Sequence, residues 1–298
     1  MWSAQKDLPG DRVSGRAGTL SEGVLPTAGR RAVGLLLLAD TATVNPPVAR
    51  QGQLDDLVAD IHRASNGTYG KRRITAELRL GYGMTVNPKA VKAAMRRLGI
   101  QGLPAPKRKR RGPQTEGAAA SDLVARQFAR DAPNQLWLTD ITEHPTREGK
   151  LYCCAVLDAH SRRVVGWSID GRQATSLVTS ALAMAVKNRK PPNGTIVHAD
   201  HRSQFTSWAF SERIKTAGLA LSMGRIGDAY DNGMMESFWA RLQTELLNRQ
   251  KWRTRLELAN AIFEYLEVFH NRKRRHSALG MLTPTEYETL YHQQQAAA

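Results

Sequence analysis

Three carboxylates between residues 140 and 236 of this 298-residue chain have a spacing that could support metal chemistry. Asp140 lies inside a segment that alternates like a β-strand, although aspartate is poorly suited to a strand interior. Asp200 ends a second apolar strand, at a place where ligand crevices form in α/β sheets. Glu236 lies on an amphipathic helix, and the residues three and four positions from it carry no positive charge. Each has an ordinary structural explanation when taken alone, such as a loop hydrogen bond or a helix cap.

Taken together, the three carboxylates predict a divalent metal site. If the strands of Asp140 and Asp200 are neighbours, the two side chains can meet, and the helix can bring Glu236 alongside. Such carboxylates would repel each other and raise each other's pKa, and a divalent cation removes that cost. Mg²⁺ or Mn²⁺ takes carboxylate oxygens and holds substrate phosphates, and a pair of such ions can catalyse phosphoryl transfer. We therefore predict two ions held by Asp140, Asp200 and Glu236, which would also be the catalytic residues.

The elements that must position these residues follow an α/β order. Three strands come first and read as an antiparallel meander, and helices then alternate with two further strands. This order predicts a mixed five-stranded sheet flanked by helices. The expected strands span 135–145, 150–162, 163–171, 194–200 and 219–225, and the expected helices span 174–189, 207–218, 230–245 and 254–275.

Alternation along the first strand also assigns its two faces. Asp140 shares a face with Leu136 and Leu138, whereas Trp137 and Ile141 point to the other face.

A small all-α region precedes this sheet. Residues 54–66, 69–80 and 87–99 predict three short helices, and Asn87 and Pro88 are typical of an N-cap and a first helical position. Three helices with a glycine turn before the last indicate a helix-turn-helix. A basic linker follows, with five consecutive cations between prolines.

The charge distribution points to a polyanionic partner, which we expect to be double-stranded DNA. Formal net charge is +16 and the isoelectric point is about 10.3. Residues 51–113 carry 14 Lys and Arg against 4 acids, whereas residues 114–298 carry 23 against 19. A cationic stretch near the C-terminus fits a solvated helix end and a phosphate contact about equally well. The candidate DNA-binding residues are Arg72, Arg73, Lys89, Lys92, Arg96, Arg97, Lys107, Arg108, Lys109, Arg110, Arg111, Arg272, Lys273, Arg274 and Arg275.

Membrane association is not expected. The longest apolar run, Ala32 to Ala39, is far too short to span a bilayer, and no signal peptide is recognisable. Adjacent Cys153 and Cys154 read as small core side chains in a reducing compartment, not as a disulfide or zinc framework.

The motifs around the three carboxylates resemble one protein family. Asp200 and Glu236 are separated by 35 residues, which is similar to the Asp, Asp, 35, Glu pattern of retroviral-integrase-like transposases. The flanking sequence resembles that of bacterial insertion-sequence transposases of the OrfB type, in the insertion sequence three family, over roughly residues 55–290. The similar stretches are "GTYGKRRITAELR", "PNQLWLTDIT", "LDAHSRRVVGWS", "HADHRSQFTS", "LSMGRIGDAYDNGMMESFWARLQTEL" and "HNRKRRHSALGMLTPTEY".

This resemblance implies a ribonuclease-H-like catalytic core with Asp140, Asp200 and Glu236 as its metal-binding triad. It implies metal-dependent cleavage and transfer of DNA strands at the ends of a mobile element, by a homo-multimer in the bacterial cytoplasm, associated with the nucleoid. We expect His198 and Asn232 to support the site.

The expected domains are a poorly defined segment 1–50, the helix-turn-helix 51–103, the linker 104–130, the core 131–290 and a disordered tail 291–298. Because 1–50 does not resemble a family N-terminus, an upstream helix-turn-helix protein, separate or fused by frameshifting, is a further expected partner.

One departure leaves the activity of this copy open. Arg202 stands where the family usually has glycine, in "HADHRSQ", and could crowd the DNA or shift Asp200. A copy that binds DNA without catalysis is therefore one alternative. A cellular ribonuclease-H-like nuclease is another, although the helix-turn-helix and the spacing to Glu236 argue against it.

Overall fold

The computed structural model describes residues 46–104, 124, 128–223 and 233–297. The chain divides into two compact units, Met1–Val44 and Asn45–Ala298, and all described residues belong to the second. The predictions that concern the N-terminal segment, the cations Lys107, Arg108, Lys109, Arg110 and Arg111, and Asn232 lie outside the described residues.

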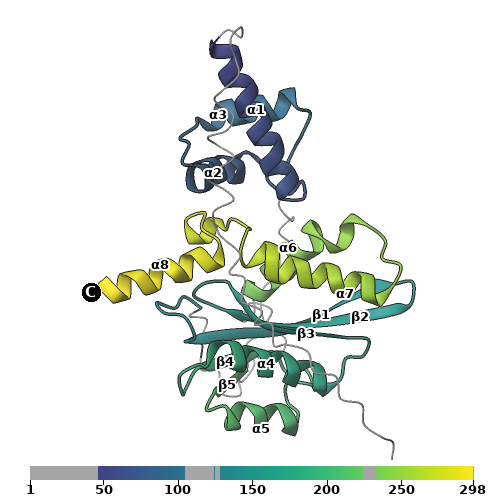
Figure 1. Ribbon diagram of the computed structural model, residues 1–298. Coiled ribbons are helices and arrows are strands. Elements are labelled where there is room, and N and C mark those ends of the chain that lie inside the picture. The colour runs from purple at the N-terminus through teal and green to yellow at the C-terminus, as the bar shows by residue number, and fades with distance from the viewer. Residues whose placement is uncertain (1–45, 105–123, 125–127, 224–232, 298) are drawn as a thin grey trace, which may run out of the picture. The chain divides into compact units, whose positions relative to one another are not determined.

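A mixed five-stranded sheet with the order β3-β2-β1-β4-β5 forms the centre of the C-terminal region (Figure 1). β1 pairs antiparallel with β2, and β2 with β3, so the predicted meander is confirmed. β4 lies parallel to β1 and to β5, which confirms that the first and fourth strands are neighbours. The strands are β1 Leu136–Thr146, β2 Gly149–Asp158, β3 Val164–Asp170, β4 Ile196–Ala199 and β5 Ala220–Met223.

Helices cover both faces of the sheet (Figure 1). On one face, Trp137, Ile141 and Val197 pack against α4 (Thr175–Arg189) and α5 (Trp208–Thr216). On the other, Leu136 and Leu138 pack against α6 (Gly233–Glu245) and α7 (Arg255–Phe263). The two faces of β1 are therefore as alternation predicted, and Asp140 belongs to the α6 side.

Gly166 lets α4 approach β3 closely. A Cβ atom at this position would lie 2.3 Å from the carbonyl oxygen of Ala181, and 2.6 Å from the backbone nitrogen of Ala185. Both contacts are with the helix backbone, so no side-chain rotation could relieve them, and this site on β3 requires glycine.

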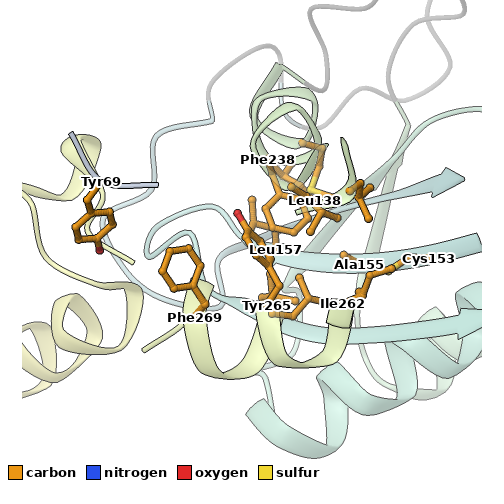
Figure 2. Packing of buried hydrophobic residues seen from close by; sticks show 14 of the residues in the cluster. Tyr69, Leu138, Cys153, Ala155, Leu157, Phe238, Ile262, Tyr265 and Phe269 are labelled. Carbon is orange, nitrogen blue, oxygen red and sulfur yellow. The ribbon is translucent and has the colours of Figure 1, made fainter. Parts of the chain in front are cut away.

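The α6 side of the sheet forms a core with the C-terminal helices (Figure 2). Phe238, Leu138 and Leu157 are each at most 2% exposed. The cluster continues through Tyr265 and Phe269 to Tyr69 of the N-terminal helical region. Removing such apolar surface from water contributes about 25 cal/mol per Å². Cys153 and Cys154 are free and buried in the sheet, as predicted.

Three helices precede the sheet: α1 (Pro46–Ala64), α2 (Lys71–Tyr82) and α3 (Pro88–Arg97). The Asn87 side chain accepts a hydrogen bond from the backbone N–H of Lys89 at 2.9 Å, so the predicted N-cap is confirmed. The C-cap of α3 is Leu98, and Gly99, the last residue of the expected range 87–99, follows it with φ +64°. Buried Val91, among others, packs α3 against the other two helices.

The C-terminal segment differs from its prediction in two ways. The expected helix 254–275 is divided into α7 and a π-helical segment, Glu264–His270. The expected disordered tail from 291 is instead part of α8 (Pro284–Ala297). Glu288 explains the order, because it is buried and accepts hydrogen bonds from Arg163 and Arg189, both at 2.7–2.8 Å. Two 3-10 turns, Leu247–Arg249 and Ser277–Leu279, complete the described elements.

No helix in the described ranges combines the length and apolar character needed to cross a bilayer.

Candidate active site

Asp140 projects from β1 toward α6. Its Oδ1 accepts a hydrogen bond from the backbone N–H of Ile141 at 2.7 Å, and its Oδ2 accepts one from the indole N–H of Trp239 at 3.1 Å. Its side chain is 14% exposed. Trp239 follows Glu236 by three residues on α6, so the two lie on neighbouring positions of one helix face. The half-buried Glu236 is thus on the part of α6 that approaches Asp140.

Asp200 lies directly after β4, beside Asp140. Leu138 of β1 pairs with His198 of β4 in parallel register. Two residues further along each chain, this register places Asp140 opposite Asp200. The repulsion between these two carboxylates contributes to the pKa of Asp140, which agrees with their proximity.

A guanidinium from the same loop bridges the two aspartates. Arg202 Nε lies 2.9 Å from Asp200 Oδ2, and Arg202 Nη1 lies 3.6 Å from Asp140 Oδ1. Nη1 also donates to the carbonyl oxygen of Ile141 at 2.7 Å, and the backbone N–H of Arg202 donates to Asp200 Oδ1 at 3.2 Å. Arg202 is therefore held by both carboxylates and by the backbone of β1.

The site perturbs the ionisation of Asp140. The pKa of this carboxyl is raised to about 6, chiefly by burial and also by the negative charge of Asp200. The charge of Arg202 and the hydrogen bonds from Ile141 and Trp239 act in the opposite direction.

We tested whether this arrangement fits a divalent cation. Asp140 and Asp200 converge on a cationic group, the Arg202 guanidinium, and offer the hard oxygen donors that Mg²⁺ and Mn²⁺ prefer. Among the described residues, no three His, Cys, Asp or Glu side chains come close enough to hold a metal together. The aspartate pair thus fits a cation, with Arg202 standing in for it.

His198 lies on β4, two residues before Asp200, and pairs in register with Leu138 of β1. Its ring is buried and its Nδ1 lies 3.0 Å from the Ser222 hydroxyl on β5. Its supporting role at the site stays a prediction.

The candidate DNA-binding cations fall into two groups. Arg274 and Arg275 are buried in ion pairs with Glu245, Glu77 and Glu286, so neither is available to solvent. Arg73 is half-buried. The exposed ones are Arg72, Lys89, Lys92, Arg96, Arg97, Arg272 and Lys273, and among them Arg97 pairs with Asp55 at 2.6 Å.

Sequence reasoning did not identify Trp239 as a site residue. The three-residue spacing between Trp239 and Glu236 could have indicated it.

The sheet order, with one aspartate inside β1 and another directly after the adjacent parallel strand β4, defines an integrase-type core. The three helices before it form a helix-turn-helix-like region. Comparison with protein families gives the same class. Residues 130–229 and 217–284 match two family models described as integrase core domain, and residues 49–110 match an HTH-like domain.

Individual relatives specify the class further. The chain is 36% identical over 237 residues to the transposase for insertion sequence element IS904 of Lactococcus lactis, covering 79% of this chain and 93% of the relative. It is 36% identical over 235 residues to transposase InsF for insertion sequence IS3A of Escherichia coli K12, covering 78% and 81%. This chain belongs to the family of insertion-sequence transposases with an integrase core domain.

A solved structure, the HTLV-2 integrase catalytic core domain in complex with magnesium, is 20% identical and covers 52% of this chain and 95% of that chain, with a TM-score of 0.38. A score this low supports no functional argument, so the family assignment relies on the sequence relatives.

Proposed function

We propose that this chain cuts and joins DNA at the ends of an insertion sequence, with Asp140, Asp200 and Glu236 as its catalytic residues. The observation that carries the proposal is the parallel register of β1 and β4, which brings Asp140 inside β1 beside Asp200 at the end of β4. The hydrogen bond from Trp239 to Asp140 supports placing the Glu236 helix at the same site.

The three carboxylates would hold two Mg²⁺ or Mn²⁺ ions. When bound, such ions activate an attacking water or 3′ hydroxyl and stabilise the leaving 3′ oxygen. The protein contributes orientation: Ile141 and Trp239 fix both oxygens of Asp140 through their N–H groups. Partial burial of Asp140 strengthens its attraction for a cation, since the surrounding dielectric constant is lower than that of water.

The helix-turn-helix region, 51–103, would bind double-stranded DNA through α3. Lys89, Lys92 and Arg96 are exposed and recur at three- and four-residue spacing, so they present one cationic face. The core, 131–290, would act in a homo-multimer near the nucleoid, with an upstream helix-turn-helix protein as a further partner.

The catalytic proposal is tested with Asp140→Asn and Glu236→Gln. We expect both variants to lose Mg²⁺-dependent strand joining while duplex binding persists, because each removes a charge from the site and not from α3. Asp170→Asn is the matched control, since Asp170 is an exposed carboxylate at the far end of β3. Activity in both variants equal to that of the parent would refute the assignment.

A second function, DNA binding without catalysis, is favoured by one observation. Arg202 already neutralises the aspartate pair, at 2.9 Å from Asp200 and 3.6 Å from Asp140. Arg202→Gly restores the residue usual at this place. If the parent does not nick DNA and Arg202→Gly does, the parent is a DNA-binding protein with a blocked site. If the parent nicks DNA, the second function is excluded.

A further inference from the structure

A second polar cavity lies apart from the aspartate pair. Its volume is about 420 Å³, which is within the range of small-ligand sites. Four arginines from separate segments line it: Arg73 from α2, Arg162 after β2, Arg241 from α6, and Arg274 from the C-terminal segment. None of its described lining residues is acidic. We call this cavity the arginine pocket.

One nearby carboxylate cannot neutralise these cations. Glu245 accepts two hydrogen bonds from Arg274, at 2.7 and 2.6 Å, and lies 3.6 Å from Arg73. It also accepts a hydrogen bond from the Tyr265 hydroxyl at 2.9 Å. Its charge is therefore already committed to Arg274.

Two of the other three arginines have no carboxylate partner in contact. Within the part of the chain that the structure describes, no Asp or Glu oxygen lies within 4 Å of Arg162 or Arg241. Burial lowers the pKa of Arg241, and the like charges of Arg274 and Arg73 lower it further. Burial likewise lowers the pKa of Arg73 and Arg162. The attraction of Glu245 and of Asp158 does not cancel the burial of these half-buried cations, since the net pKa of each is lowered.

A buried histidine adds a further unsatisfied group. His276 is 3% exposed and lines the arginine pocket, and its Nε2 has no hydrogen-bond partner among the described residues. Burial keeps the pKa of His276 well below its usual range, so its ring is neutral, and the tautomer with a proton on Nε2 is a hydrogen-bond donor. Buried donors of this kind are normally paired with an acceptor.

We propose that the arginine pocket binds a phosphate group. Guanidinium groups recognise phosphate oxygens through paired N–H donors. An anion would offset the burial of Arg162 and Arg241, and the repulsion of Arg241 by Arg73 and Arg274. Under the proposed function, on which this step relies, the group is a backbone phosphate of DNA. A DNA phosphate held there would be contacted both by α2 of the helix-turn-helix region and by α6, which carries Glu236.

Phosphate binding itself is tested without DNA or metal. Inorganic phosphate is titrated into the full chain at constant ionic strength, and the thermal midpoint is measured for the parent and for the Arg162→Met/Arg241→Met variant. We expect phosphate to raise the midpoint of the parent by several degrees and to have at most a small effect on the variant. In the absence of phosphate, the variant should be at least as stable as the parent, because two half-buried cations without a carboxylate in contact have been removed.

Arg213→Met is the matched control. It removes one exposed cation from α5, on the other face of the sheet, and should respond to phosphate like the parent. An equal response of the parent and the double variant, or no response of the parent, would overturn the phosphate site.

The source of the phosphate is tested with a short duplex. If DNA supplies it, the double variant should bind the duplex at least tenfold more weakly than Arg213→Met. The slope of log K against log salt concentration should fall in magnitude by about 0.9, because the contact with one phosphate is lost. Unchanged duplex binding in a protein that still binds free phosphate would overturn the DNA assignment. A parent that binds phosphate and DNA but does not cut DNA would refute the catalytic proposal and leave the arginine pocket supported.

Discussion

Arg202 donates through Nε to Oδ2 of Asp200 at 2.9 Å, from a position two residues further along the same loop. The same guanidinium reaches the carbonyl oxygen of Ile141 on β1, so it fastens the loop after β4 to the neighbouring strand. A divalent cation that needs both Asp140 and Asp200 must displace this group. The Arg202 guanidinium and a divalent metal ion therefore compete for the two aspartates.

The first prediction concerns this competition. Arg202→Met keeps much of the length of the side chain and removes its charge, so the aspartate pair should bind divalent ions at least tenfold more tightly. Titration with Mn²⁺, followed by the shift in thermal midpoint, measures the effect without requiring activity. Arg172→Met is the control, because Arg172 lies after β3, outside the aspartate pair. Equal Mn²⁺ responses in the parent and Arg202→Met would show that Arg202 does not compete.

The second prediction concerns the orientation of Asp140. Trp239→Phe removes the indole N–H that binds Oδ2 of Asp140 and keeps most of the aromatic volume. A hydrogen bond to a charged group contributes about 1.5–3 kcal/mol, so strand joining should fall by at least tenfold. The pKa of Asp140 should also rise, since this hydrogen bond lowers it. Trp208→Phe is the control, as Trp208 is 79% exposed. The measurements are joining rates and a titration of Asp140 by NMR, and an unchanged joining rate would exclude this positioning role.

The third prediction concerns α3. Replacing Lys89, Lys92 and Arg96 with Gln should weaken duplex binding. The slope of log K against log salt concentration should fall in magnitude by about 2.7, because each lost phosphate contact accounts for about 0.9. Arg97 is left in place because it pairs with Asp55. Replacing Lys187, Lys190 and Lys215 with Gln removes the same charge from the core. If both triple variants showed the same salt dependence, α3 would have no special contact with DNA.

The fourth prediction concerns a buried ion pair. Glu245→Gln should reduce the free energy of unfolding by about 3–5 kcal/mol at neutral pH, because it leaves Arg274 buried without its carboxylate. Denaturant unfolding measures this change. Glu264→Gln, at an exposed position, should change stability by less than about 0.5 kcal/mol.

The same pair predicts a pH dependence. Burial by itself would raise the pKa of Glu245, but the hydrogen bonds and charge of Arg274 outweigh it, so the net pKa is lowered. A lowered carboxyl pKa stabilises the fold above the unfolded-state pKa of about 4.5, and this stability is lost as the pH falls through the folded-state pKa. The difference in stability between the parent and Glu245→Gln should be constant above about pH 6 and shrink below about pH 4.5. A difference that grew on acidification would contradict the pairing.

The sequence by itself determined the order of elements and the face on which Asp140 lies. Alternation along residues 135–145 separated Leu136 and Leu138 from Trp137, and the two cores divide in the same way. Asn87 and Pro88 marked the start of α3, because helix capping depends on residues adjacent in sequence. Such features depend on local periodicity and backbone geometry, which the order of residues carries directly.

Only the tertiary structure decided which charges meet. The register of β1 against β4 brought together Asp140 and Asp200, which are 60 positions apart in the sequence. Arg274 and Arg275 belong to a basic stretch whose sequence does not distinguish exposed from buried arginines, yet both are buried against Glu245 and Glu77. Arg202 was visible as a departure from a motif, but not as the group that bridges both aspartates. Coulomb interactions depend on distance in space and on burial, and neither is encoded in the spacing of charges along the chain.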